Sequence, residues 1–316
     1  MGVTTALDTD AARRQAPPQR SRRQGLQRNL SFYIMFLPAL LLLIGAMYPF
    51  VLGVFTSLTN TKLYIPAVKF VGLKNYVNLF QDDVFLTGLA VTLTYTVLVL
   101  LIQIPLGIVV ALLLDVPTRL RKLFCTTLVL PLLLPPIVAA LMWKTMMQPA
   151  SGVLNYLLSL VGLGPFPWLT STQTALLSVV LIDTWVYMPF AALILLAGLQ
   201  SVPEESVEAA LVDGASGWAV FRYIKVPWIL PYILLVTLFR AADALKTFDL
   251  IYPTTRGGPL DSTRVLHVMA YEEVFRWASL GKAMAIVMVL WLISYAVSFL
   301  LMNRWQRQAE AYQDGV

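Results

Sequence analysis

The chain has 316 residues, of which 58% are hydrophobic and only 13% are charged, and its formal net charge is +6. Soluble domains carry about 25% charged residues, so this composition excludes an ordinary soluble domain and indicates an integral membrane protein. The single cysteine, Cys125, and the single histidine, His267, exclude an internal disulfide and a metal site built from histidine and cysteine.

Six apolar runs are each long enough to cross a membrane. A bilayer core is about 30 Å thick and a helix rises about 1.5 Å per residue, so about 20 mostly apolar residues suffice. The first run follows an arginine-rich segment, but it is longer than the apolar part of a signal peptide, so we expect a retained helix. The sequence therefore predicts an all-α, polytopic membrane protein with six transmembrane helices. The runs cover residues 31–57, 87–114, 123–147, 174–200, 229–252 and 281–303.

The cationic residues are unevenly distributed between the two sides of this predicted topology. The side that holds both termini carries 13 Lys and Arg residues, and the opposite loops carry 6. The positive-inside rule therefore places both termini in the cytoplasm. Because topology and anionic lipid account for the positive charge, no nucleic-acid partner is implied. We expect a mobile basic cytoplasmic tail at 1–30, a six-span domain at 31–303 and a cytoplasmic C-terminal tail at 304–316.

Prolines and aromatic residues mark the third and fourth runs. The third contains Pro131, Pro135 and Pro136, which predict a broken or bent helix. The fourth contains the sequence Asp183-Thr-Trp-Val-Tyr-Met-Pro189-Phe190, in which the proline can kink the helix. The aromatic side chains of this sequence can stack on a sugar ring or hydrogen-bond to its hydroxyl groups. Packing between helices is the alternative.

The segment 201–228, between the fourth and fifth runs, predicts two short amphipathic helices joined at a corner. Ser201 and Glu204 fit a capping box that starts the first helix. Asp213-Gly214 predicts the break, with the glycine in the left-handed conformation. We expect the second helix to end before Pro227. A solvated connection is the alternative, but the length and the apolar face of the segment favour a cytoplasmic partner.

The fifth run carries Arg240, Asp243, Lys246 and Asp249 at three-residue intervals. Residues three apart can pair, so we expect Arg240 to pair with Asp243, and Lys246 with Asp249. Such spacing drifts by about 60° per step, so the four side chains do not all face one cavity. Ionisable residues inside a membrane are costly. Either an ion pair that locks this helix to a neighbour or a polar lining of a solute path explains them.

Three motifs resemble those of known transport proteins. Glu208-Ala-Ala-Leu-Val-Asp-Gly-Ala215, followed by Phe221, resembles the EAA motif of binding-protein-dependent ABC importer permeases. The segment 248–259 and the sequence Gly72-Leu-Lys-Asn-Tyr76 resemble segments of the carbohydrate-uptake permeases of the maltose and glycerol-3-phosphate type. The similarity extends over most of the chain from about residue 31, and it implies the ABC type I importer permease fold.

The resemblance also implies two sets of functional residues. In this family the EAA loop, here 201–228, sits in a cleft of the cytoplasmic ATPase, and the fourth and fifth spans line the solute site. The implied ATPase-coupling residues are Glu205, Glu208, Ala209, Ala210, Asp213, Gly214, Ala215 and Phe221. The implied residues of the substrate pathway are Trp185, Tyr187, Phe190, Arg240, Asp243, Ala244 and Thr247.

The resemblance implies a transport subunit in a prokaryotic plasma (inner) membrane rather than an enzyme. Its expected partners are a second related permease, a cytoplasmic dimer of ATP-binding subunits, an extracellular solute-binding protein and membrane lipid. The chain has no G-x-x-x-x-G-K-[ST] pattern, so ATP and Mg are expected on the ATPase partner and no cofactor on this chain. The expected cargo is a sugar-like solute moved by alternating access. An oligosaccharide, a disaccharide, a polyol and a glycerol phosphate all remain open, because the fifth span is charged where the maltose permease is largely neutral.

Two alternatives belong to other functional classes. An ion-coupled secondary transporter would use Asp183, Arg240 and Asp243 for proton or sodium coupling, and it would not need an EAA loop. A non-transporting membrane subunit would have no reason to carry the coupling-loop pattern. The sequence shows no nucleophile–base constellation or phosphate-binding loop that would favour an enzyme.

Overall fold

The computed structural model describes residues 22–313, and the side chains of residues 36–307. Within these residues the chain forms helices and two isolated β-bridges but no strand, which confirms the predicted all-α class. The chain divides into two compact units, residues 1–52 and 53–316. The N-terminal unit contains most of helix α1, Arg22–Ser57, whose apolar stretch from Phe36 to Ser57 is long enough to span a membrane.

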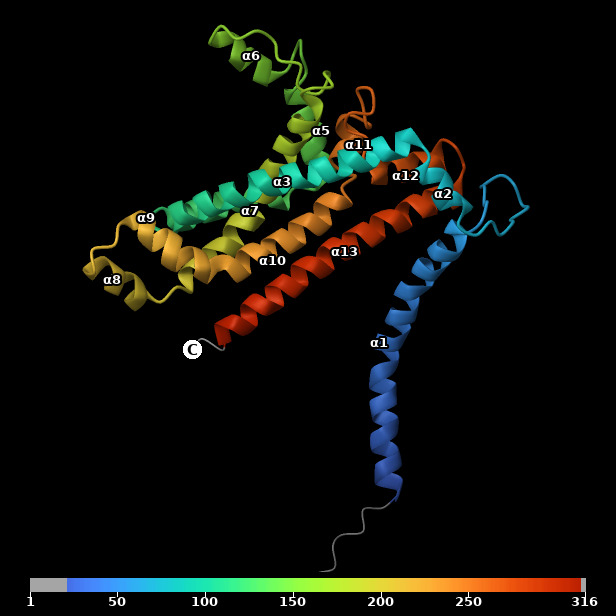
Figure 1. The fold of residues 1–316 in the computed structure, drawn as a ribbon, viewed down its shortest axis with the longest axis horizontal. Helices are drawn as coiled ribbons and strands as arrows, with labels where there is room; N and C mark the ends of the chain where they lie inside the picture. Colours follow the sequence, from blue (N-terminus) through green and yellow to red (C-terminus); the bar gives the residue numbers. More distant parts are fainter. Residues whose placement is uncertain (1–21, 314–316) are drawn as a thin grey trace, which may run out of the picture. The chain divides into compact units, whose positions relative to one another are not determined.

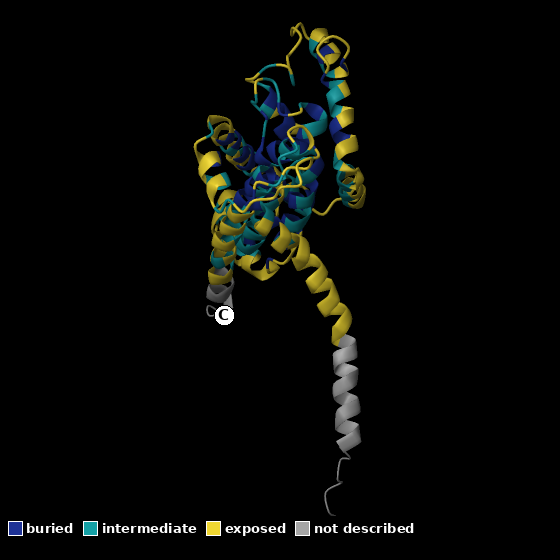
Figure 2. Ribbon diagram, turned by 90° about the vertical axis from the view of Figure 1, so that its right-hand side faces the viewer, coloured by how far each residue is buried: buried dark blue, intermediate teal, exposed yellow. Residues whose placement is uncertain are grey.

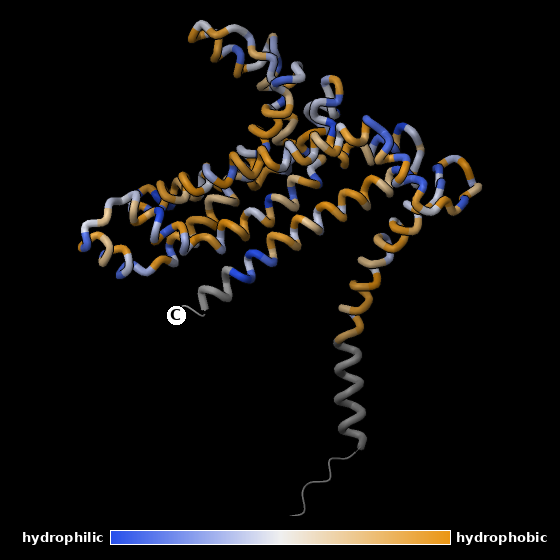
Figure 3. Tube along the Cα trace, viewed as in Figure 1, coloured by the Kyte–Doolittle hydropathy of each residue, from blue (hydrophilic) through white to orange (hydrophobic). Residues whose placement is uncertain are grey.

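The second unit is a bundle of four long helices (Figure 1). Helix α7 is the most buried of them, and the buried residues lie along the centre of the bundle in Figure 2. Apolar residues dominate the four helices, whereas hydrophilic residues gather in the loops and towards the C-terminal end of the last helix (Figure 3). This distribution is that of a membrane domain. The four helices are α3 (Asp83–Asp115), α7 (Ala175–Gln200), α10 (Val226–Leu245) and α13 (Leu280–Gln313).

Short helices occupy the two ends of this bundle (Figure 1). Helices α2 (Lys74–Phe80), α11 (Ile251–Thr254) and α12 (Leu266–Phe275) lie at one end. Helices α8 (Glu204–Val212) and α9 (Gly217–Val220) lie at the other end, where α13 also terminates. The two ends of the bundle therefore consist of different segments. Helix α6 (Val153–Leu160) follows the third predicted span.

The third predicted span is a broken helix. Helix α4 (Arg121–Val129) continues into the 3₁₀ turn η1 (Leu130–Leu133), and α5 (Pro136–Met146) follows after a bend of 94°. The backbone of Leu134 and Pro135 is extended, as expected before a proline. The predicted break is therefore confirmed. With this pair counted as one span, the described residues contain the six spans that the sequence predicts.

Two helices extend beyond the predicted apolar spans, because hydropathy does not locate helix ends. Helix α1 begins at Arg22 rather than residue 31, and α13 runs to Gln313 rather than 303. Arg, Gln and Glu favour helix, so polar residues extend both helices beyond their apolar parts. Of the predicted terminal tails, residues 1–21 and 314–316 lie outside the described residues.

The fifth span also differs from its prediction. Helix α10 ends at Leu245 rather than residue 252, and it continues α9 through the π-helical turn η2 (Phe221–Lys225). The second helix of the 201–228 segment therefore does not end before Pro227. A π turn changes the hydrogen-bond register, and this one ends two residues before Pro227, which donates no backbone hydrogen bond.

Glycines allow the long helices to approach closely. A Cβ atom built on Gly198 of α7 would lie 2.8 Å from ring atoms of Tyr232 in α10. One built on Gly107 of α3 would lie 3.1 Å from the Cβ of Ala191 in α7. Small residues at such positions let the backbones of transmembrane helices come close.

We expect Gly198→Val to lower stability by about 1–3 kcal/mol, because the added side chain would force α7 and α10 apart. Denaturant titration of the purified protein in detergent measures this change. Gly164→Val is the matched control, because no atom lies within 4 Å of its Cβ position. Equal stability of the two variants would contradict the proposed close contact.

Candidate functional site

A buried polar network joins the centres of three long helices. Asp183 of α7 accepts hydrogen bonds from Tyr95 Oη (2.6 Å) and Gln103 Nε2 (2.5 Å), both of α3. Arg240 of α10 donates to the same carboxylate through Nη2 (2.5 Å) and to Gln103 Oε1 through Nε (2.7 Å). The guanidinium carbon also lies 4.3 Å from the ring centroid of Tyr187, within cation–π range. Each of these contacts therefore joins residues of two different helices.

The ion pair of Arg240 and Asp183 is almost completely sheltered. Both residues are 1% exposed, and Tyr95 and Gln103 are fully buried. Removing one partner of a buried pair leaves an uncompensated charge, which costs about 3–5 kcal/mol. The pair thus fits the prediction of an ion pair that locks the fifth span to a neighbour. The partner that the sequence predicts for Arg240 is Asp243. Its Oδ2 atom lies 3.9 Å from Arg240 Nη1, which is farther than the contact with Asp183.

A polar pocket of about 310 Å³ opens beside this network. Arg240 lines it, and its buried Nη1 atom has no hydrogen-bond partner among the described residues. Of the residues predicted for the substrate pathway, Tyr187, Asp243 and Thr247 also line this pocket. The pocket thus offers both hydrogen-bond donors and acceptors. Its other lining residues are Asp183, Lys246, Phe248, Asp249, Leu250 and His267.

The predicted pairing of Lys246 with Asp249 was wrong. Lys246 Nζ lies 3.6 Å from Asp243 Oδ1, and no ion pair in the described part of the chain joins Lys246 to Asp249. The rule for residues three apart applies only within a helix. Because α10 ends at Leu245, Asp249 lies beyond it.

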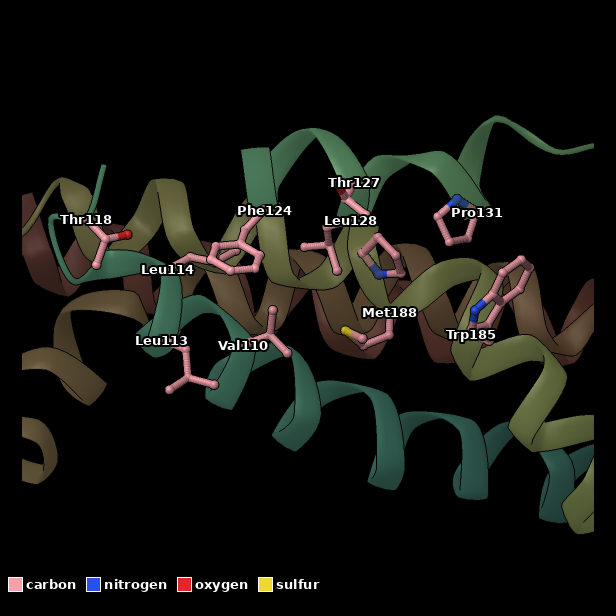
Figure 4. Close-up of a pocket in the computed structure, with 11 residues that line it drawn as sticks. Val110, Leu113, Leu114, Thr118, Phe124, Thr127, Leu128, Pro131, Trp185 and Met188 are labelled. Carbon is pink, nitrogen blue, oxygen red and sulfur yellow. The ribbon is translucent and has the colours of Figure 1, made fainter. Parts of the chain in front are cut away.

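The remaining predicted pathway residues lie outside the polar pocket. Trp185 packs edge-to-face against Trp143 of α5 (centroids 5.7 Å apart) and lines a separate apolar pocket (Figure 4). Phe190 packs edge-to-face against Phe239 of α10 (6.2 Å). Ala244 is buried in the core. The structure thus gives these side chains contacts between elements, and their place in a solute path stays a prediction.

An aromatic cluster adjoins the pocket. Phe248 stacks on Tyr252 (centroids 5.0 Å apart) and contacts Tyr271 (5.0 Å) and His267 (5.5 Å). Tyr271 and His267 belong to α12, whereas Phe248 lies between α10 and α11. The sequence motif that begins at Phe248 points to this region, but nothing in the sequence places Tyr271 beside it.

The segment 201–228 forms the predicted corner at the opposite end of the bundle. Gly214 follows α8 with φ +83°, the left-handed conformation that the sequence predicts. The predicted capping box was wrong. Pro203 occupies the N-cap of α8, whereas Ser201 caps the C-terminus of α7 and donates to Gly198 O (2.7 Å). Ser201 comes too early in the chain to cap α8.

Most of the predicted coupling residues form an exposed surface. Glu205, Glu208, Ala209, Asp213 and Gly214 are exposed, while Ala210, Ala215 and Phe221 are half-buried. Large apolar side chains lie among them, with Val212 86% and Trp218 71% exposed. Exposed apolar groups of this size mark interaction sites.

An ion pair ties this surface to the bundle. Lys225 Nζ, at the end of η2, lies 2.9 Å from Asp115 Oδ2, at the end of α3. Both side chains are partly exposed, so the pair contributes modestly to stability. It links this exposed surface to the end of α3.

Comparison with known proteins gives consistent matches. Residues 103–310 match the family described as binding-protein-dependent transport system inner membrane component. The chain is 36% identical over 293 residues to a probable ABC transporter permease protein, y4oQ, of Sinorhizobium fredii, covering 92% of this chain and 94% of that relative. It is 32% identical over 277 residues to the trehalose/maltose transport system permease protein MalF of Thermococcus litoralis, covering 87% of this chain and 94% of that relative.

A solved structure shares the fold. The chain is similar to one chain in the crystal structure of a bacterial alginate ABC transporter in complex with an alginate pentasaccharide-bound periplasmic protein. The TM-score is 0.78 and the identity 24%, over 90% of this chain and 96% of that chain. This likeness confirms the ABC type I importer permease fold that the motifs imply.

We expect Arg240→Leu to destabilise the protein by about 3–5 kcal/mol, because Asp183 would remain buried and charged. Replacing both residues by leucine should cost less than the sum of the single changes. Denaturant titration in detergent measures these free energies of unfolding. Asp243→Leu is the control, with an expected change below about 1 kcal/mol because its side chain is 55% exposed. A loss below 1 kcal/mol for Arg240→Leu would contradict the role of the pair.

Proposed function

This chain belongs to the family of binding-protein-dependent transport system inner membrane components, and we propose that it is the membrane-spanning permease subunit of an ATP-driven importer for a sugar-like solute. The observation that carries this proposal is the exposed corner of α8 and α9, with Gly214 in the left-handed conformation. Its exposed apolar side chains need a partner in the cytoplasm. That partner is a dimer of ATP-binding subunits, which holds ATP and Mg and hydrolyses the nucleotide.

The polar pocket and its aromatic neighbours support a carbohydrate cargo. A sugar hydroxyl both donates and accepts hydrogen bonds, and the pocket presents Arg240 and Lys246 as donors and Asp243 as an acceptor. The ring faces of a sugar stack on aromatic side chains such as those of Phe248 and Tyr252. One relative is named for trehalose and maltose transport, and the structural neighbour transports alginate. These names support the same class of cargo.

Transport proceeds by alternating access between two permease subunits. An extracellular binding protein delivers the solute to the end of the bundle that holds α11 and α12, which carries the polar pocket. The α8–α9 end faces the ATPase. Helix α13 terminates at that same end (Figure 1), which supports a cytoplasmic C-terminus. Because α9, η2 and α10 form one continuous helix from 217 to 245, a movement of the corner reaches the residues beside the pocket directly.

The ion-coupled alternative would require Asp183 to release or bind a cation during transport. Both of its carboxylate oxygens already accept hydrogen bonds, and one of them also contacts Arg240. A carboxylate held in this way supports a fixed structural pair. The two proposals differ in their need for ATP, which an uptake assay can measure.

The corner between α8 and α9 provides the test of the proposed function. We expect the tagged chain, purified in mild detergent, to carry a related permease and an ATP-binding subunit with it. Gly214→Val should lose the ATP-binding subunit and abolish uptake, because a β-branched residue is strained at φ +83°. Gly162→Val is the matched control. Its φ is +76° and its Cβ position is also free of neighbours, but it lies outside the corner, so this variant should retain both.

Two outcomes would overturn the proposal. One is a Gly214→Val variant that keeps its ATPase and transports normally. The other is a chain that purifies alone and transports solute into vesicles without ATP, which would establish the ion-coupled transporter instead.

A further inference from the structure

A second pocket, distinct from the polar one, lies between α3, α4 and α7. Its volume is about 550 Å³, which is in the range of about 300–1,000 Å³ typical of ligand sites. Figure 4 shows it as a long space that runs from Thr118 at one end to Trp185 at the other. Val110 and Leu128 line the middle of this space.

The walls of the pocket are almost entirely apolar. Thr118 and Thr127 supply its two aliphatic hydroxyl groups, and Trp185 supplies one indole N–H. Two of its large apolar side chains are strongly exposed, with Leu113 at 70% and Phe124 at 55%. Such walls suit a hydrocarbon chain, because they offer it apolar contacts and few hydrogen-bonding groups.

One end of the pocket is basic. Arg119, Arg121 and Lys122 follow Thr118 directly and precede Phe124, so their backbone lies at the Thr118 end. No ion pair in the described part of the chain involves any of the three. Their charges are thus available to an anion.

The start of α4 adds to this charge. Helix α4 has nine residues and begins at Arg121, and no side chain caps its N-terminus. The backbone N–H of Arg121 donates to Thr118 O (3.2 Å), so it is the dipole of such an end that favours a phosphate. The same end of the pocket therefore combines cationic side chains with the positive end of a helix dipole.

We propose that this pocket binds an anionic phospholipid, with an acyl chain between α3, α4 and α7 and the headgroup phosphate at Arg119, Arg121 and Lys122. An apolar space with one cationic end matches the two parts of such a lipid. The proposal rests on the orientation in the proposed function, which places the α3–α4 connection at the cytoplasmic surface. There the lipid headgroups are anionic. The lipid would thereby hold the broken third span against α7.

The test uses the complete complex, in nanodiscs of phosphatidylcholine that contain a trace of phosphatidylglycerol with a photoactivatable diazirine in its acyl chain. After illumination, the labelled peptides are identified by mass spectrometry. We expect the label to concentrate on residues such as Leu128 and Met188. Val110→Trp, which fills the pocket, should reduce this label severalfold. Leu101→Trp, on an exposed part of α3 outside the pocket, should not.

The three cationic side chains are tested separately, because Val110→Trp fills the pocket and can disturb folding. Replacing Arg119, Arg121 and Lys122 by glutamine should reduce labelling by the phosphatidylglycerol probe severalfold and leave labelling by a matched phosphatidylcholine probe unchanged. Arg222→Gln is the control, because Arg222 is an exposed cation that does not line the pocket. Co-purification of the partner subunits shows that each variant has assembled.

Any one of three results would overturn the proposal. The first is a label that is spread evenly over the exposed surface of α3 and α4 and is unaffected by Val110→Trp. The second is equal labelling by the two lipid probes. The third is a cross-link from a photoreactive amino acid at Phe124 to another subunit, which would show that protein fills the pocket. Because these readouts do not depend on uptake, a chain that fails to transport sugar but retains the label would contradict only the proposed function.

Discussion

The buried ion pair between Arg240 and Asp183 is the interaction on which the arrangement of the bundle depends. Two charges that are almost completely sheltered are stable only when both are present and their remaining hydrogen-bonding groups have partners. Tyr95 and Gln103 provide those partners from α3. Because the network draws on α3, α7 and α10, these helices cannot slide past one another without separating the charges. The centre of the bundle is therefore expected to move as one body.

This rigid centre connects two ends with different chemistry. At one end lie the polar pocket, with Asp243 and Lys246, and the aromatic residues around Phe248. At the other end lies the exposed corner at Gly214, tied to α3 by Lys225 and Asp115. The continuous helix from 217 to 245 links them. A force applied at the corner is thus transmitted along one helix instead of through a chain of flexible loops.

The polar pocket and the apolar pocket differ in what they can hold. The pocket at Arg240 has charged and hydroxyl groups on its walls and suits a hydrophilic cargo. The pocket between α3, α4 and α7 has aliphatic and aromatic walls and suits hydrocarbon (Figure 4). Helix α7 contributes to both, with Tyr187 facing the first and Trp185 and Met188 lining the second. Different faces of α7 thus line the predicted cargo site and the proposed lipid site.

The sequence by itself determined the features that depend on local chemistry. Long apolar runs favour membrane spans, Pro135 and Pro136 favour a break in a helix, and Gly214 is suited to a left-handed corner. Only the tertiary structure decided which distant groups meet. Asp183 and Arg240 are 57 positions apart, so no spacing rule could identify them as partners. Tyr271 likewise reaches Phe248 from another helix. Helix ends such as Leu245 and the capping role of Ser201 also depend on packing between elements, because several local solutions have similar free energies and tertiary contacts select among them.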